Sequence, residues 1–77
     1  MINIRDKKFI KSFGQNLRKL RSANGLTQED LAYSADIPIS QIGRIERGEI
    51  NTTISTINAL ANALNIEPKE LLNFPSK

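Results

Sequence analysis

Apolar residues recur every three or four positions along almost all of this 77-residue chain. The clearest stripe lies near the N-terminus and consists of Ile10, Phe13, Leu17 and Leu20. Such spacing places side chains on one face of an α-helix, which can then be buried against other helices. No segment alternates apolar and polar residues for long enough to predict a β-strand. The chain is therefore expected to fold as an all-α domain.

Residues that commonly start and end helices divide the chain into five predicted helices. Gly25 and Gly48 suit the left-handed position after a helix, and Thr27 with Asp30 makes a capping-box-like start. Pro38 marks the end of the second helix, because the residue before a proline is pushed out of the helical region. The predicted helices span residues 6–24, 28–35, 38 or 39–47, 54–65 and 68–72. The residues expected on the inner faces of the second, third and fourth helices are Leu31, Ala32, Ala35, Ile42, Ile45, Ile54, Ile57, Leu60, Ala61 and Leu64.

The composition limits both the size and the chemistry of the domain. Residues 1–77 suffice for one domain with a single small core, and no linker or internal repeat divides them. The chain has no cysteine and no histidine, so it lacks disulfides, the commonest metal ligands and the commonest general base. No apolar run approaches the roughly 20 residues that cross a bilayer. We expect a cytoplasmic protein without a metal, a cofactor, a small-molecule ligand or a membrane partner.

Basic residues are concentrated near the N-terminus of the chain. The formal net charge is +3, and seven of the eleven Lys and Arg residues lie within the first 21 positions. Arg44 and Arg47 add two further bases in the third predicted helix. This distribution is compatible with a polyanionic partner, and a solvated basic helix face explains it equally well.

The second and third predicted helices form a candidate helix-turn-helix unit over residues 28–47. Many helix pairs in small bundles bind nothing, so this topology alone does not establish a nucleic-acid site. An α-helix does fit the major groove of B-DNA, where its outward side chains read base edges. The third helix suits this role, because Ile42 and Ile45 face inward and leave polar and basic residues outward.

One known family is similar to this chain over about residues 13–72. The similar stretch includes RKLRSANGLTQEDLAYSADIPISQIGRIERGEINTTISTINALANALN, with GLTQEDLA, IGRIERGE and TTISTINALANALN as its most specific parts. It resembles the helix-turn-helix domain of the lambda-type repressor and Cro (XRE-like) family of transcription regulators. The motifs LTQEDLAY, IERG and TI also resemble the small controller proteins of restriction–modification systems. The resemblance implies a five-helix, lambda-repressor-like DNA-binding domain.

The resemblance implies that four residues approach DNA bases: Ile39, Ser40, Gln41 and Arg44. Their chemistry fits this role, because arginine pairs with guanine, glutamine pairs with adenine, and isoleucine can pack on a thymine methyl. Other interpretations stay open, namely a solubilising Arg44, an Ile39 packed on the second helix, and a Ser40 bonded to local backbone. Gly43 costs about 1 kcal/mol in a helix relative to alanine, which either close approach to DNA or tight helix packing would explain.

Four further residues are expected to contact the DNA phosphates: Gln28, Arg47, Asn51 and Thr52. Gln28 opens the second helix, where free N–H groups and the helix dipole favour an anion, and its counterpart in the family touches the DNA backbone. The other three lie at or just beyond the end of the third helix, where the chain would run beside a phosphate strand. Tyr33 can donate its hydroxyl to a phosphate or cover the edge of the core.

A structural ion pair and a dimer interface complete the prediction. At the positions of Arg21 and Glu46, the family pairs an arginine of the first helix with a glutamate of the third, which orients the two helices. One short recognition helix covers few base pairs, so a homodimer on an inverted repeat is expected. Leu72 and Phe74 are the predicted dimer contacts, with Phe74 alternatively closing the core.

These features predict a sequence-specific transcription regulator that binds double-stranded DNA as a homodimer and contacts RNA polymerase where it activates. The alternative is an antitoxin-type protein-interaction module that also binds its own promoter. Antitoxins commonly carry an added toxin-wrapping segment, for which the five predicted helices leave little chain. An enzyme is disfavoured, because the chain lacks histidine, cysteine, a glycine-rich phosphate loop and the length for a closed pocket.

Overall fold

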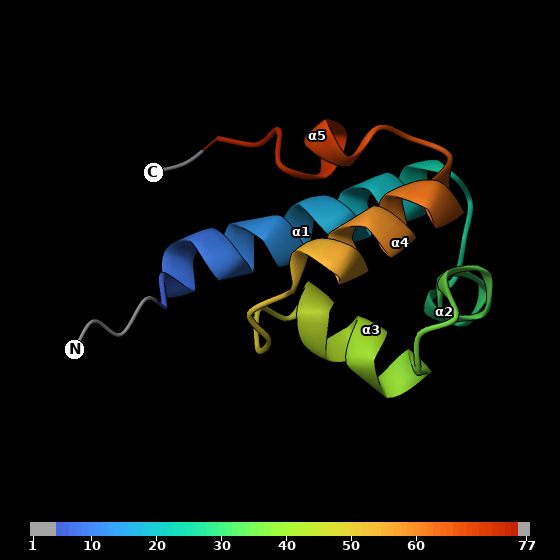
Figure 1. Cartoon of the computed structure of the whole chain (residues 1–77), viewed down its shortest axis with the longest axis horizontal. Helices are drawn as coiled ribbons and strands as arrows, with labels where there is room; N and C mark the ends of the chain where they lie inside the picture. Colours follow the sequence, from blue (N-terminus) through green and yellow to red (C-terminus); the bar gives the residue numbers. More distant parts are fainter. Residues whose placement is uncertain (1–4, 76–77) are drawn as a thin grey trace.

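Five α-helices make up the fold of this chain, in a computed structural model that describes residues 5–75 (Figure 1). The ends of the predicted 1–77 domain, residues 1–4 and 76–77, lie outside the described part. The helices are α1 (Lys7–Ala23), α2 (Gln28–Ala35), α3 (Ile39–Glu46), α4 (Ile54–Leu64) and α5 (Pro68–Leu71). Each lies within two residues of its expected limits, and residues 5–75 contain no strand. The prediction of an all-α fold is thereby confirmed.

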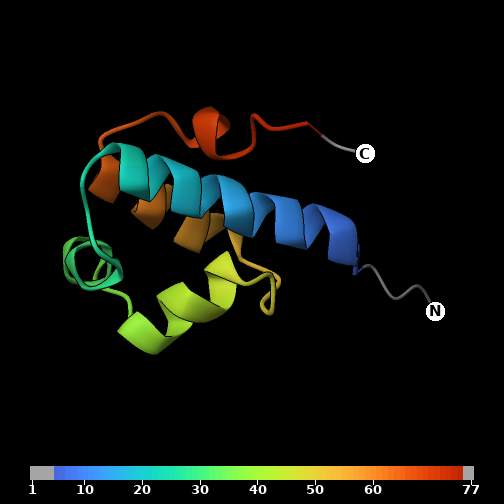
Figure 2. The ribbon, with the colours of Figure 1, turned by 180° about the vertical axis from the view of Figure 1, so that it is seen from behind.

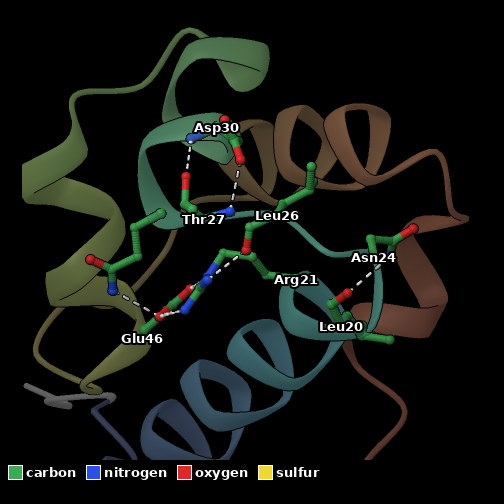
Figure 3. Close-up of polar contacts among 8 residues, drawn as sticks. Leu20, Arg21, Asn24, Leu26, Thr27, Asp30 and Glu46 are labelled. Atoms are coloured by element: carbon green, nitrogen blue, oxygen red, sulfur yellow. Dashed lines mark hydrogen bonds and ion pairs between the residues drawn. The ribbon is translucent and has the colours of Figure 1, made fainter.

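The helices begin and end at the residues whose local chemistry favours those positions. Asp6 caps α1 by accepting a hydrogen bond from the N–H of Phe9 at 3.0 Å. Thr27 accepts from the N–H of Asp30, whose carboxylate accepts in return from the N–H of Thr27, so the predicted capping box opens α2 (Figure 3). Gly25 follows α1 with φ +70°, the left-handed conformation predicted for it.

The helices form a closed ring of neighbours around one core. α1 packs against α3 and α5, α4 packs against α2 and α5, and α2 packs against α3. In both views, α3 and α5 lie on opposite sides of α1 (Figures 1 and 2). All five helices contribute to the six almost wholly buried side chains at the centre: Leu17, Leu31, Ile42, Ile45, Leu60 and Leu71. Burying side chains of this size contributes about 1.5–3 kcal/mol each, so this core holds α3 firmly on the domain.

Ile54 departs from the predicted burial pattern. It was expected on the inner face of α4, but its side chain is 86% exposed. Ile54 is the first residue of α4, and helical side chains lean towards the helix N-terminus, so this one projects beyond the end of the helix. The other predicted inner residues of the second, third and fourth helices are buried or half-buried.

Gly14 allows α1 and α3 to approach each other closely, a role that the periodicity of α1 does not reveal. A Cβ atom on Gly14 would lie 2.7 Å from the carbonyl oxygen of Glu46, and closer still to that of Ile45. Main-chain atoms of α3 thus occupy the space that a side chain on α1 would need. This contact seats the C-terminal half of α3 directly on α1.

Candidate nucleic-acid interface

α2 and α3 are joined by a three-residue turn that sets their relative orientation. Asp36 ends α2 in the left-handed conformation with φ +58°, and the N–H of Ile37 donates to the carbonyl of Ala32. Aspartate tolerates this conformation better than most residues. Pro38, with φ −56° and ψ 140°, then leads into α3. The two helices pack directly against each other and form the predicted helix-turn-helix unit.

α3 buries one face and presents the other to solvent. Ile42 and Ile45 have no exposed surface and lie beneath the helix. The four residues expected to read bases are at least partly accessible: Ile39, Ser40, Gln41 and Arg44. Ile39 keeps 50% of its surface exposed, so packing against α2 accounts for only part of this apolar side chain. The outward face of α3 therefore combines an isoleucine, two small or amide polar groups and an arginine.

Glu46 is the buried polar centre between α1, α2 and α3 (Figure 3). Arg21 of α1 donates two hydrogen bonds to its carboxylate, from Nε to Oε2 at 2.6 Å and from Nη2 to Oε1 at 3.1 Å. Gln28 of α2 donates from Nε2 to Oε1 at 2.9 Å. The hydrogen bond from its guanidinium to Glu46, together with the negative charge of that carboxylate, raises the pKa of Arg21. The structure thus brings Arg21 and Glu46 together and adds Gln28 to the pair.

The residues expected to contact phosphates differ in their exposure to solvent and in their hydrogen bonds. One amide N–H of Gln28 is taken up by Glu46, which leaves the second N–H and the N-terminus of α2 for an anion. Asn51 is exposed in the loop after α3. Thr52 differs from Asn51, because its hydroxyl is buried without a hydrogen-bond partner. Thr52 lines a hollow of about 70 Å³ between α1 and the loop, so its side chain points into the domain.

Arg47, the fourth of these residues, folds back across α3. Its Nη1 lies 3.0 Å from the point where a Cβ on Gly43 would stand, so this glycine makes room for a guanidinium. Gly43 itself is buried beneath that side chain. The neighbours of the missing Cβ are flexible side-chain ends, so tight packing of helix backbones is not the reason for this glycine.

Glu49 lies between the two arginines of this face and was not among the predicted site residues. Its Oε2 is 2.8 Å from Arg47 Nε, and its Oε1 is 3.6 Å from Arg44 Nε. Hydrogen bonding to Arg47 lowers the pKa of Glu49, and the same contact raises the pKa of Arg47. Arg5 also donates to the Glu49 carbonyl oxygen at 3.3 Å, which brings part of the basic N-terminal cluster to this loop. In the sequence, the signal for Glu49 is that an acidic residue directly follows the segment RIERG, which contains Arg44 and Arg47.

The three remaining predicted contact residues lie outside this face or at its margin. Leu72 is 45% exposed at the end of α5. Phe74 is half-buried, with its ring centroid 5.1 Å from that of Phe9, so it packs largely within the chain. Tyr33 is almost wholly exposed on α2 and therefore does not cover the edge of the core.

Two further properties of the structure concern other possible ligands. None of the helices described is both long and apolar enough to cross a membrane. Within residues 5–75, no three or more acidic side chains cluster closely enough to hold a metal ion.

Comparison with known proteins places this geometry in a family. The helix-turn-helix family matches residues 17–71 of the chain. Control protein C.BamHI of Bacillus amyloliquefaciens is 40% identical over 63 residues, which cover 80% of this chain and 78% of that protein. Control protein C.SmaI of Serratia marcescens is 43% identical over 58 residues, covering 75% of this chain and 69% of that protein. The solved restriction-modification controller protein C.AhdI from Aeromonas hydrophila is similar with a TM-score of 0.77 and 49% identity, covering 82% of this chain and 94% of that one.

The matched segment contains all of α2, α3 and α4, and so the whole helix-turn-helix unit. Relatives of this identity and coverage confirm both the resemblance to transcription regulators and the five-helix fold that it implied. The chain belongs to the helix-turn-helix family of DNA-binding transcription regulators.

Proposed function

We propose that this chain is a controller-type regulator of a restriction–modification system, which binds an inverted-repeat operator as a homodimer. α3 of each copy would enter the major groove of one half-site. The observation that carries this proposal is the outward face of α3, where the four candidate base-reading side chains are at least partly accessible while Ile42 and Ile45 hold the helix from beneath. A rigid helix with such a face can read base edges.

Each outward residue of α3 has a chemically reasonable partner in the groove. Arg44 would pair with guanine through two N–H groups, a contact that contributes about 1–3 kcal/mol of discrimination against the wrong base. Gln41 would pair with adenine, Ser40 with several base edges, and Ile39 with a thymine methyl. Contacts to the phosphates would come from Arg47, Asn51 and the N-terminus of α2 at Gln28, and would fix the register on the duplex.

A dimer would place two copies of α3 on one side of the duplex, about 34 Å apart. Leu72, exposed at the end of α5, is our candidate for the dimer contact, together with the neighbouring apolar surface at Phe9. Both residues line the same hollow. A dimer bound beside a promoter could then repress by occupancy or activate by touching RNA polymerase.

Selection of binding sites from random duplex DNA tests this function. The full chain should enrich one motif at near-physiological salt, where binding through phosphates alone is weak. We expect a two-fold symmetric motif whose half-sites are separated by about one helical turn. Recovery of unenriched DNA, or of a single unrepeated half-site, would contradict the proposed dimeric regulator.

A further inference from the structure

Glu49 forms an ion pair with each of the two arginines of the candidate DNA-binding face, in both cases through the Nε atom of the guanidinium. Each of its carboxylate oxygens faces the Nε of one guanidinium, at 2.8 Å for Arg47 and 3.6 Å for Arg44. The terminal nitrogens of both guanidiniums are therefore not needed for this contact. Nη1 of Arg47 lies over Gly43, in the space left by the missing Cβ.

A carboxylate in this position has two effects on binding to DNA. First, it competes with phosphates for both guanidiniums, and its negative charge disfavours any complex built on phosphate contacts alone. Second, it limits the conformations of two long, flexible side chains before DNA arrives. At the correct site, Arg44 can keep its Nε beside Glu49 while its terminal N–H groups meet a guanine.

We propose that Glu49 is a positioning residue that raises the discrimination between operator and non-specific DNA by orienting Arg44, while Arg47 holds its carboxylate in place. This role rests on the proposed function, because it requires that α3 bind a preferred duplex sequence. The contact is not needed for folding, since the side chains of Glu49, Arg44 and Arg47 are 48%, 57% and 60% exposed. Exposed ion pairs contribute little to stability, so variants of Glu49 should fold normally.

The test compares the affinity of Glu49→Gln for a selected operator and for a scrambled duplex of equal length. The ratio of the two dissociation constants should fall by about threefold or more, a part of the discrimination expected of one arginine–guanine pair. Removal of the negative charge should strengthen binding to both duplexes, so the fall in the ratio should come from the operator, whose binding also loses the orientation of Arg44. Glu67→Gln is the matched control, because Glu67 is exposed at the start of α5, which lies across α1 from α3 (Figure 1). Its ratio should equal that of the unchanged chain.

Glu49→Asp distinguishes the effect of where the carboxylate lies from the effect of its negative charge. It keeps the negative charge but shortens the side chain by one methylene group, so it cannot reach both guanidiniums at once. The ratio should fall in Glu49→Asp too. In a chain that already carries Arg44→Ala, adding Glu49→Gln should leave the ratio unchanged.

An unchanged ratio in Glu49→Gln, with both affinities raised alike, would mean that the carboxylate acts only as a charge and would overturn the proposal. A wild-type ratio in Glu49→Asp would overturn it as well. A failure of the proposed function is distinguishable from either result, because the unchanged chain would then bind both duplexes equally.

Discussion

At the scale of single residues, Glu46 links α3 to both α1 and α2. It is 6% exposed and accepts hydrogen bonds from side chains of two other helices. Glu46→Ala leaves Arg21 unpaired at a largely buried position, and breaking a buried ion pair on one side costs about 3–5 kcal/mol. For a domain of this size that cost approaches the whole free energy of unfolding. Equilibrium unfolding in urea measures the change.

DNA binding should disappear in Glu46→Ala only to the extent that the domain unfolds. Glu67→Ala removes the same group from an exposed position at the N-cap of α5 and should cost at most about 0.5–2 kcal/mol, less than Glu46→Ala. A Glu46→Ala chain as stable as the unchanged protein, yet unable to bind DNA, would mean that Glu46 contacts DNA and does not act through the fold.

Gly14 provides a second prediction for a single residue. Gly14→Ala places a methyl group against main-chain oxygens of α3, so we expect a loss of about 1–3 kcal/mol or more in the free energy of unfolding. Helix propensity alone would predict a gain of about 1 kcal/mol, so the sign of the change decides whether the close contact of α1 and α3 exists.

Gly25→Ala is the matched comparison for Gly14→Ala. A methyl group there would meet no atom within 4 Å, but the backbone has φ +70°, which costs about 1–2 kcal/mol for other residues. Thermal unfolding should therefore show both variants destabilised. Gly14→Ala should also weaken DNA binding, because it displaces α3, and Gly25→Ala should not.

At the level of helices, the capping box of α2 makes stability depend on acid pH. Hydrogen bonds from Thr27, the backbone N–H first, lower the pKa of Asp30. Folding thus favours the ionised carboxylate, whose contribution is complete above the unfolded pKa of about 3.9 and is lost as the pH falls through the lower folded value. Asp30→Asn should therefore lose stability less steeply below about pH 4. Urea midpoints between about pH 2 and 6 test this.

Part of the acid dependence should remain in Asp30→Asn, because Arg47 also lowers the pKa of Glu49. An acid slope identical to that of the unchanged chain would indicate that the capping box does not form in solution.

The limits of the helices were predictable because capping chemistry is local. Thr27, Gly25 and Gly48 act through bonds or backbone angles within a few residues of themselves. The exposure of Ile54 was not predictable from periodicity, which identifies a helix face but does not show whether another element covers it. The periodicity of α1 likewise gave no indication that Gly14 touches α3, since that contact depends on how two separate helices cross.

At the scale of the whole molecule, the periodicity that predicted the buried side of α3 also predicted which of its side chains are accessible. The inward spacing of Ile42 and Ile45 also fixes which residues of α3 point outward. The pairing of Arg21 with Glu46 was implied by the resemblance. Two other features were not predicted, namely the hydrogen bond from Gln28 to Glu46 and the burial of the Thr52 hydroxyl. Both depend on the tertiary arrangement of the helices, which the local sequence does not predict.

The predicted phosphate contact of Arg47 has a consequence for binding to any duplex. Arg47→Ala should weaken binding to operator and scrambled DNA alike, and should reduce the slope of log affinity against log salt by about one unit. Lys19→Ala removes a charge from the side of α1 near Phe74, so it should leave that slope nearly unchanged. A loss confined to the operator would instead assign Arg47 to base reading.

The most direct measurement is the affinity of Arg44→Ala for the selected operator and for every single-base-pair variant of it. If α3 reads the major groove, this variant should fold normally and bind the operator about 1–3 kcal/mol more weakly, with preference lost at one base pair in each half-site. Preference at all other positions should be retained. Unchanged affinity, or an equal loss for every sequence with all preferences intact, would contradict the account.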